Sequence, residues 1–187
     1  MKKKLLLHTC CAPCASGCVP QLENYDITLF FYNPNIDTLE EYNRRLEALY
    51  TLVTEYNAEF NTDIKIIAVP YNHDEFKSKV IGYESEPEGG KRCDICFALR
   101  LDKTFDYASK NGYDIVASTL SISPHKDFAL INTIGEGLSK KHGIEYLPSN
   151  FKKKNGFLMS IQNSKKYNLY RQTYCGCMLP NENNKQN

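Results

Sequence analysis

The chain has 187 residues with a formal net charge of +1, of which 42% are hydrophobic and 24% are charged. A chain of this length buries a hydrophobic core without covalent cross-links, and its balanced charge lacks the basic excess that is usual in nucleic-acid binders, which leaves only a local basic patch open. No stretch approaches the roughly 20 apolar residues of a membrane span. The eight cysteines therefore need a chemical explanation.

The N-terminus looks at first like a secretory signal, because three lysines precede three leucines. A signal needs an apolar region of roughly 7–15 residues, and here His8 and Thr9 end the run. We interpret this segment as a first strand and expect a cytoplasmic protein with no membrane partner. In the cytoplasm, clustered cysteines indicate metal or redox chemistry more often than disulfides.

Predicted strands and helices alternate along the chain. Apolar and β-forming runs predict strands at residues 4–8, 27–32, 64–69, 114–120 and 144–147. Helical spacing predicts helices at residues 39–57, 94–111 and 128–142, the last two stopped by Gly112 and Gly143. This order predicts one α/β domain over residues 1–178, a mostly parallel sheet with helices on both faces. Residues 179–187 are expected to be a disordered tail.

The first cysteine group follows the first predicted strand, as Cys10, Cys11, Cys14 and Cys18. Ligands of open parallel sheets bind outside the carboxyl ends of the strands. Thiols and a proline stand here where phosphate-binding loops have glycines, so a metal is favoured over a nucleotide. Cys18 comes about one helical turn after Cys14, and we interpret it as a small core residue.

The second group, Cys93 and Cys96, lies at the predicted start of a helix, where N–H groups and the helix dipole stabilise thiolates. Together with Cys10 and Cys11 it would supply the four ligands of a cubane iron–sulfur cluster, if the fold brings the loop and the helix start together. Zinc accepts the same four ligands. Adjacent cysteines fit a zinc knuckle poorly, so the spacing favours iron–sulfur.

The third group, Cys175 and Cys177, is separated by a single glycine. A disulfide across one residue closes a small, strained ring, which is easily reduced and suits a catalytic role. Alternatively, both thiols bind one further metal ion together with Cys14. The spacing leaves both alternatives open.

Six segments spread over the chain match one family in the same order. They are LLLHTCCAPC from Leu5, YNPNI from Tyr32, CDICFALRL from Cys93, STLSISPHKD from Ser118, NFKKKNGF from Asn150 and YNLYRQTYCGC from Tyr167. With these segments the chain resembles the QueH-type epoxyqueuosine reductases. Asp37 and Thr38 depart from the His-Pro expected in that family after Ile36, which concerns the contacts of that loop.

The resemblance implies the last step of queuosine formation, the two-electron removal of the epoxide oxygen from epoxyqueuosine in a tRNA anticodon. It implies an adenine-nucleotide hydrolase-like (Rossmann-like) fold and a 4Fe-4S cluster on Cys10, Cys11, Cys93 and Cys96. For Cys175 and Cys177 it implies a redox-active pair or ligands to one additional iron ion. The tRNA is the expected partner, and an external donor must supply the electrons.

Several further residues are candidates for contact with the substrate. His125 is a candidate proton donor or tRNA contact because imidazole titrates near neutral pH, although an ordinary loop histidine explains it equally well. Tyr32, Asn33 and Asn35 would stack on or bond an extruded base, although an Asn-Pro turn explains part of this pattern. His8 is interpreted as a core residue. The candidate phosphate contacts are Arg100, Lys126, Lys152, Lys153, Lys154 and Arg171.

Two other functions use the same residues. A thiol–disulfide or electron-transfer iron–sulfur protein would need the cysteines but no tRNA. A zinc-stabilised RNA-binding domain would need four thiols and a basic surface but no turnover. Metal content and salt-dependent binding of tRNA distinguish these alternatives.

Overall fold

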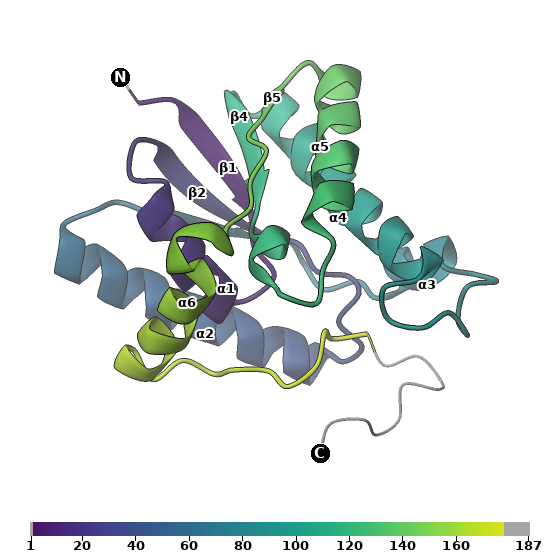
Figure 1. The fold of residues 1–187 in the computed structure, drawn as a ribbon, viewed down its shortest axis with the longest axis horizontal. Helices are drawn as coiled ribbons and strands as arrows, with labels where there is room; N and C mark the ends of the chain where they lie inside the picture. Colours follow the sequence, from purple (N-terminus) through teal and green to yellow (C-terminus); the bar gives the residue numbers. More distant parts are fainter. Residues whose placement is uncertain (1, 178–187) are drawn as a thin grey trace.

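The computed structural model describes residues 2–177, without the side chain of Lys154. These residues form a five-stranded parallel sheet in the order β3-β2-β1-β4-β5 (Figure 1). The strands are β1 (Lys4–His8), β2 (Asp26–Phe31), β3 (Lys65–Ala68), β4 (Ile115–Ser118) and β5 (Glu145–Tyr146). The helices are α1 (Ala12–Cys18), α2 (Leu39–Phe60), α3 (Asp74–Lys79), α4 (Lys91–Lys110), α5 (Phe128–His142) and α6 (Gly156–Lys166). The predicted α/β fold is confirmed.

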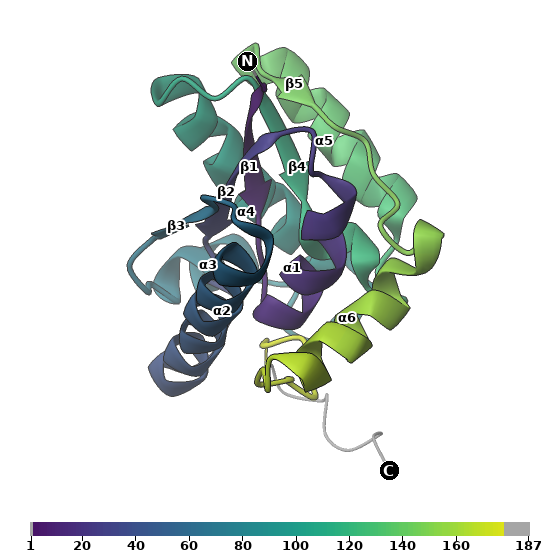
Figure 2. The same ribbon diagram turned by 90° about the vertical axis from the view of Figure 1, so that its left-hand side faces the viewer.

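Helices cover both faces of the sheet, as predicted. Successive strand residues point to opposite faces, so Leu5 and Leu7 pack in one core cluster while Leu6 packs in another. Figure 2 shows α1, α2 and α6 on one face and α4 and α5 on the other. No helix within residues 2–177 is long and apolar enough to cross a membrane.

Predicted boundaries hold best where a cap residue marks them. Helix α5 begins and ends as predicted, because the Asp127 carboxylate accepts hydrogen bonds from the first turn and Gly143 ends the helix with φ 69°. Helix α4 begins at Lys91, before the predicted start, and the predicted strand at 114–120 ends at Ser118. Helices α3 and α6 were not predicted. The predicted tail at 179–187 lies outside the described residues.

Helix α6 packs very closely on α1. A Cβ atom on Gly17 of α1 would lie 2.3 Å from the carbonyl oxygen of Gly156 at the start of α6, so the two backbones meet where neither residue has a side chain. After α6 the chain runs along α2 to the start of that helix, where Tyr170 bonds Glu41 and Tyr174 bonds Asp37 (Figure 1). We call residues 167–177 the C-terminal segment.

Candidate functional site

The site lies where the strand order of the sheet reverses. Strand β1 has β2 on one side and β4 on the other, and the loops that follow β1 and β4 leave this point. Such switch points are where open α/β sheets bind ligands. The loop after β1 carries Cys10, whose backbone N–H donates to Thr119 Oγ1 at 3.3 Å in the turn after β4. The two loops are thereby joined directly behind the candidate metal ligands.

Three thiols converge in the loop after β1. The sulfur atoms of Cys10, Cys11 and Cys14 all lie within 4.8 Å of one another, and they form the candidate metal site among the residues that the structure describes. Cys11 caps α1, because its sulfur accepts the backbone N–H of Cys14 at 3.4 Å. The protein therefore contains a buried group of thiols that can bind a metal.

The thiols of this group differ in acidity. Hydrogen bonds from Cys11 and then Cys14 hold the pKa of Cys10 well below its usual value. Burial raises the pKa of Cys11 to about 12. One thiolate therefore forms readily in the metal-free protein, and a metal that binds the others must displace their protons.

The second cysteine pair lies in the first two turns of α4. The end of this helix leads into the start of β4. The start of the helix therefore lies at the carboxyl ends of the strands, where β1 ends. Cys93 packs against the hydrophobic cluster that contains Cys10 and Cys11, whereas Cys96 packs in a neighbouring cluster with Phe76. The fold thus brings the loop and the helix start together, although neither Cys93 nor Cys96 belongs to the compact group of three sulfurs.

Burial opposes thiolate formation at this second pair. Burial raises the pKa of Cys96 to about 12 and also raises the pKa of Cys93. Loss of hydration penalises the Cys93 thiolate more than the hydrogen bond from the Gly89 backbone N–H favours it, and at Cys96 it outweighs the attraction of Arg100. Ligation by Cys93 and Cys96 stays a prediction.

Two cations lie among the three cysteine groups. Arg100 is only 1% exposed, and its pKa rises despite the opposing effect of burial because Cys96, Cys175, Cys10 and Cys93 surround it. The pKa of Lys126 rises in the same way, against burial, through Cys175, Cys10 and Cys14. Both cations can therefore neutralise thiolate charge. Arg100 faces thiols and has almost no surface for the predicted phosphate contact.

A small open cavity connects the second and third cysteine groups. Its lining includes Cys93, Cys96, Cys175 and Cys177 together with Arg100, His125 and Lys126. His125 is exposed. The candidate proton donor thus lies at a cavity that reaches four thiols, and its role stays a prediction.

The residues after β2 are buried. Tyr32, Asn33 and Asn35 are 3%, 2% and 1% exposed. The Tyr32 hydroxyl donates to Glu75, and the Asn33 amide donates to the carbonyl of Thr9 at 3.0 Å. In this structure they support the strand ends and offer little surface to a base, so their contact with substrate stays a prediction.

Other predicted residues lie as follows. Lys153 and Arg171 are exposed, and Arg171 also donates to the Ser160 carbonyl at 3.2 Å. Lys152 donates to the carbonyl of Lys126 at 3.0 Å, on the same side of the site. Cys18 and His8 are fully buried, which confirms that both are core residues. Burial lowers the pKa of His8 to about 3, so the ring is neutral.

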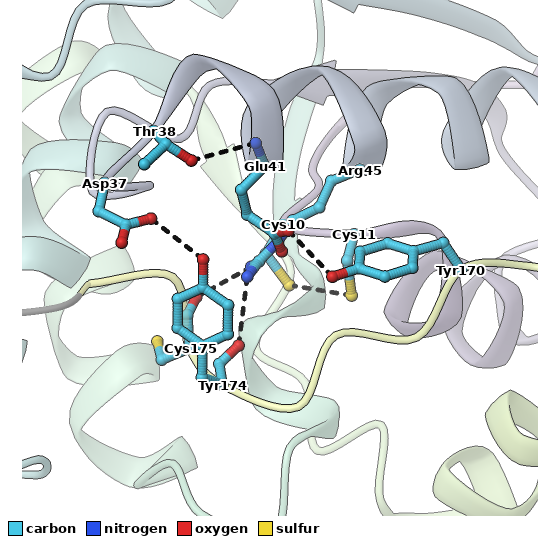
Figure 3. Close-up of polar contacts among 9 residues, drawn as sticks. All are labelled: Cys10, Cys11, Asp37, Thr38, Glu41, Arg45, Tyr170, Tyr174 and Cys175. Carbon is cyan, nitrogen blue, oxygen red and sulfur yellow. Dashed lines mark hydrogen bonds and ion pairs between the residues drawn. The ribbon is translucent and has the colours of Figure 1, made fainter. Parts of the chain in front are cut away.

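A buried ion pair that was not predicted from the sequence lies beside the cysteines. Arg45 and Glu41 of α2 are 2% and 6% exposed, and Arg45 Nε lies 2.6 Å from Glu41 Oε1 (Figure 3). Arg45 also donates to the backbone carbonyls of Tyr174 and Cys175. The signal was available as a Glu and an Arg at i and i+4 in a helix, but such pairs are common on solvated surfaces.

A solved structure shares the fold. The predicted subunit of a tRNA methyltransferase from Methanocaldococcus jannaschii superposes with a TM-score of 0.50 at 14% identity, covering 86% of this chain and 74% of that chain. At this identity the likeness shows the fold alone.

Sequence relatives identify the family. The family model described as epoxyqueuosine reductase QueH matches residues 5–183. A protein of that name from Streptococcus pyogenes is 42% identical, covering 95% of this chain and 70% of its own length. The Thermotoga maritima protein of the same name is 32% identical, covering 94% of this chain and 88% of its own length. The chain therefore belongs to the epoxyqueuosine reductase QueH family.

Proposed function

We propose that this epoxyqueuosine reductase acts on epoxyqueuosine in tRNA anticodons and holds a 4Fe-4S cluster on Cys10, Cys11, Cys93 and Cys96. Membership of the family makes the chain an oxidoreductase. The observation that supports a cluster is the convergence of cysteines from the loop after β1, from α4 and from the C-terminal segment around Arg100. A tRNA substrate also favours the cytoplasm as the place of action.

The donor set fits an iron–sulfur group. Thiolates are the usual ligands of such clusters, and nearby positive charge and hydrogen bonds adjust their reduction potentials. Arg100 and Lys126 supply the positive charge, and the Cys10 sulfur lies 3.5 Å from the Thr119 hydroxyl. When bound, the cluster would supply electrons one at a time. Cys14, Cys175 and Cys177 remain for one additional iron ion or for a redox-active pair.

The chemistry requires protons as well as electrons. Two electrons and two protons convert the epoxide to an alkene and water. His125 is exposed at the cavity that also contains Lys126, Cys175 and Cys177. We propose that His125 protonates the leaving oxygen, because imidazole exchanges protons near neutral pH.

The tRNA would approach this edge of the sheet through phosphate contacts. Lys153 and Arg171 are exposed, and Lys152 is half-buried beside Lys126. We propose Lys152, Lys153, Lys154 and Arg171 as phosphate contacts, with Tyr32, Asn33, Asn35, Arg100 and Lys126 closer to the modified base. Binding through phosphates should weaken as salt is raised.

The first test is the iron and sulfide content of anaerobically purified protein, followed by an assay on tRNA that carries epoxyqueuosine. We expect about four iron and four sulfide per chain, or about one further iron if the second site is filled, and conversion of epoxyqueuosine to queuosine with a chemical reductant. Zinc without iron, even after reconstitution, would favour the RNA-binding alternative. If the protein holds a cluster but shows neither turnover nor salt-dependent binding of tRNA, the result would favour the electron-transfer alternative.

A further inference from the structure

The C-terminal segment has no helix or strand of its own around Cys175. Its position depends on contacts with the start of α2. The Tyr174 hydroxyl donates to Asp37 Oδ1 at 3.1 Å, and the backbone N–H of Asp37 donates to the carbonyl of Gly176 at 2.9 Å. These contacts bring the residues on either side of Cys175 to the start of α2.

Arg45 provides the contacts at the Cys175 peptide. Its Nη1 donates to the carbonyl of Cys175 at 2.9 Å and its Nη2 donates to the carbonyl of Tyr174 at 3.2 Å, so one guanidinium holds two successive carbonyls (Figure 3). The Tyr174 ring also lies against this group, with 5.3 Å between the guanidinium carbon and the ring centroid. A planar fork of donors suits such a paired contact, whereas a lysine offers a single point charge.

The guanidinium is itself held in place from α2. Arg45 Nε donates to Glu41 Oε1 at 2.6 Å, and the Tyr170 hydroxyl donates to the other Glu41 oxygen at 2.9 Å. Thr38 Oγ1 accepts the backbone N–H of Glu41 and so caps the helix turn that carries this pair. All three donor nitrogens of Arg45 are therefore engaged, which restricts its side chain to one orientation.

Gly176 fits against the same group. It has φ +117°, and a Cβ atom there would lie 3.2 Å from Arg45 Nη1 and 3.2 Å from Ile36 Cγ1. The glycine between the two cysteines thus allows the peptide to turn directly over the guanidinium. The side that faces away from α2 then presents Cys175 and Cys177 to the cavity that contains Cys93 and Cys96.

We propose that Arg45 is a positioning residue, which holds the Tyr174 and Cys175 carbonyls so that the Cys175 thiol faces the other cysteines. Its direct effect is on where Cys175 lies. The consequence for reduction of the epoxide rests on the proposed function, in which Cys175 takes part as a redox thiol or an iron ligand.

The test compares Arg45→Lys with Arg44→Lys in the anaerobically purified, iron-loaded enzyme under reducing conditions. Arg45→Lys keeps the buried positive charge beside Glu41 but removes the two guanidinium N–H groups that bind the Tyr174 and Cys175 carbonyls. Arg44 is the matched control because it is the preceding residue and is half exposed, and its partners are Glu40 and the Tyr170 ring rather than the Tyr174 and Cys175 carbonyls. Mass spectrometry would follow alkylation by iodoacetamide of Cys175 and of Cys18, which is fully buried in the core and reports unfolding of the whole domain.

We expect Arg45→Lys to raise the alkylation rate of Cys175 about tenfold or more, since hydrogen bonds from a charged donor are lost, with Cys18 still protected and Arg44→Lys unchanged. In the tRNA assay kcat should fall with little change in KM, because Arg171 is held by Ser160 and Ser164 of α6 rather than by Arg45, and the other proposed phosphate contacts lie outside the C-terminal segment. Unchanged reactivity of Cys175 would overturn the proposal, as would equal increases at Cys175 and Cys18. Increased reactivity with normal kcat would support positioning by Arg45 and instead refute the role of Cys175 in the reaction.

Discussion

The first and last cysteine groups reach the site by different structural means. Cys10, Cys11 and Cys14 follow directly from a buried strand into a helix, so hydrogen bonds of regular secondary structure place them. Cys175 lies in an irregular segment and depends on the side chains of Arg45, Tyr174 and Asp37. The first group is therefore part of the sheet architecture, whereas the last is attached to it by a few side-chain contacts.

This difference indicates how the two groups should respond to change. Replacing a thiol of the first group should remove metal binding and leave the fold intact, because the fold does not depend on a disulfide bond there. Changes in the contacts of the C-terminal segment should alter its attachment and leave the first group in place. The following variants, together with Arg45→Lys, test this distinction.

The largest effect is expected for Cys10→Ser. Serine is a poor ligand for iron in place of a thiolate, so the visible absorption and the iron and sulfide contents of the anaerobic protein should be almost entirely lost. Cys18→Ala is the matched control, since Cys18 lies in the core and outside the candidate metal group. It should keep the full chromophore. A full chromophore in Cys10→Ser would refute ligation by this thiol.

A smaller effect is expected for Gly17→Ala, which tests the support of the C-terminal segment by α6. The added Cβ would lie 2.3 Å from the Gly156 carbonyl oxygen and 2.6 Å from Ile122 Cδ1. Overpacking of this kind should lower the free energy of unfolding by about 1–3 kcal/mol, measured by urea denaturation. Gly137→Ala in α5, where a Cβ meets no atom within 4 Å, should instead stabilise the protein by about 0.5–1 kcal/mol. Equal stability of the two variants would contradict close contact of α1 with α6.

The smallest effect is expected for Tyr174→Phe, which removes the hydrogen bond to Asp37 and keeps the ring against Arg45. Loss of one hydrogen bond should cost about 0.5–1.5 kcal/mol of unfolding free energy. Hydrogen exchange should also become faster in peptides from the C-terminal segment and stay unchanged in β1. Tyr50→Phe on the same helix as Arg45 is the control, because Tyr50 is 50% exposed. Equal exchange in the two variants would show that Tyr174 does not hold the segment.

The sequence predicted those parts of the fold in which local signals agree. Strand β1 and helix α5 were predicted with their observed bounds, because an apolar run and the Asp127 and Gly143 caps mark their ends. Helix α6 was missed, and its contact with α1 is made through glycine backbone rather than through apolar side chains. No local pattern reveals a close approach between two distant glycines.

The residue types of the candidate site were predicted from the sequence, and the structure corrected which of them are exposed. The three cysteine groups were identified from the sequence, and the topology places them at one edge of the sheet. Burial was not foreseen for Tyr32, Asn33 and Asn35, because residues at a strand end were expected to face the ligand, nor for Arg100 of α4, which was expected to contact a phosphate. Arg45 was missed because its partners, the Tyr174 and Cys175 carbonyls, lie 129 and 130 positions away.

The long separation in sequence between Arg45 and Cys175 also determines when their contact can form during protein synthesis. Chains emerge from the ribosome with the N-terminal part first, and contacts between distant residues form only after a long loop has closed, which costs conformational entropy. The contacts of Tyr170 and Cys175 with α2 span 129 and 130 positions, and the contact of Tyr174 with Asp37, just before α2, spans 137. The first three thiols thus exist on a nascent chain before Cys175 and Cys177 have been made, so the complete site assembles only after residue 177 has been synthesised.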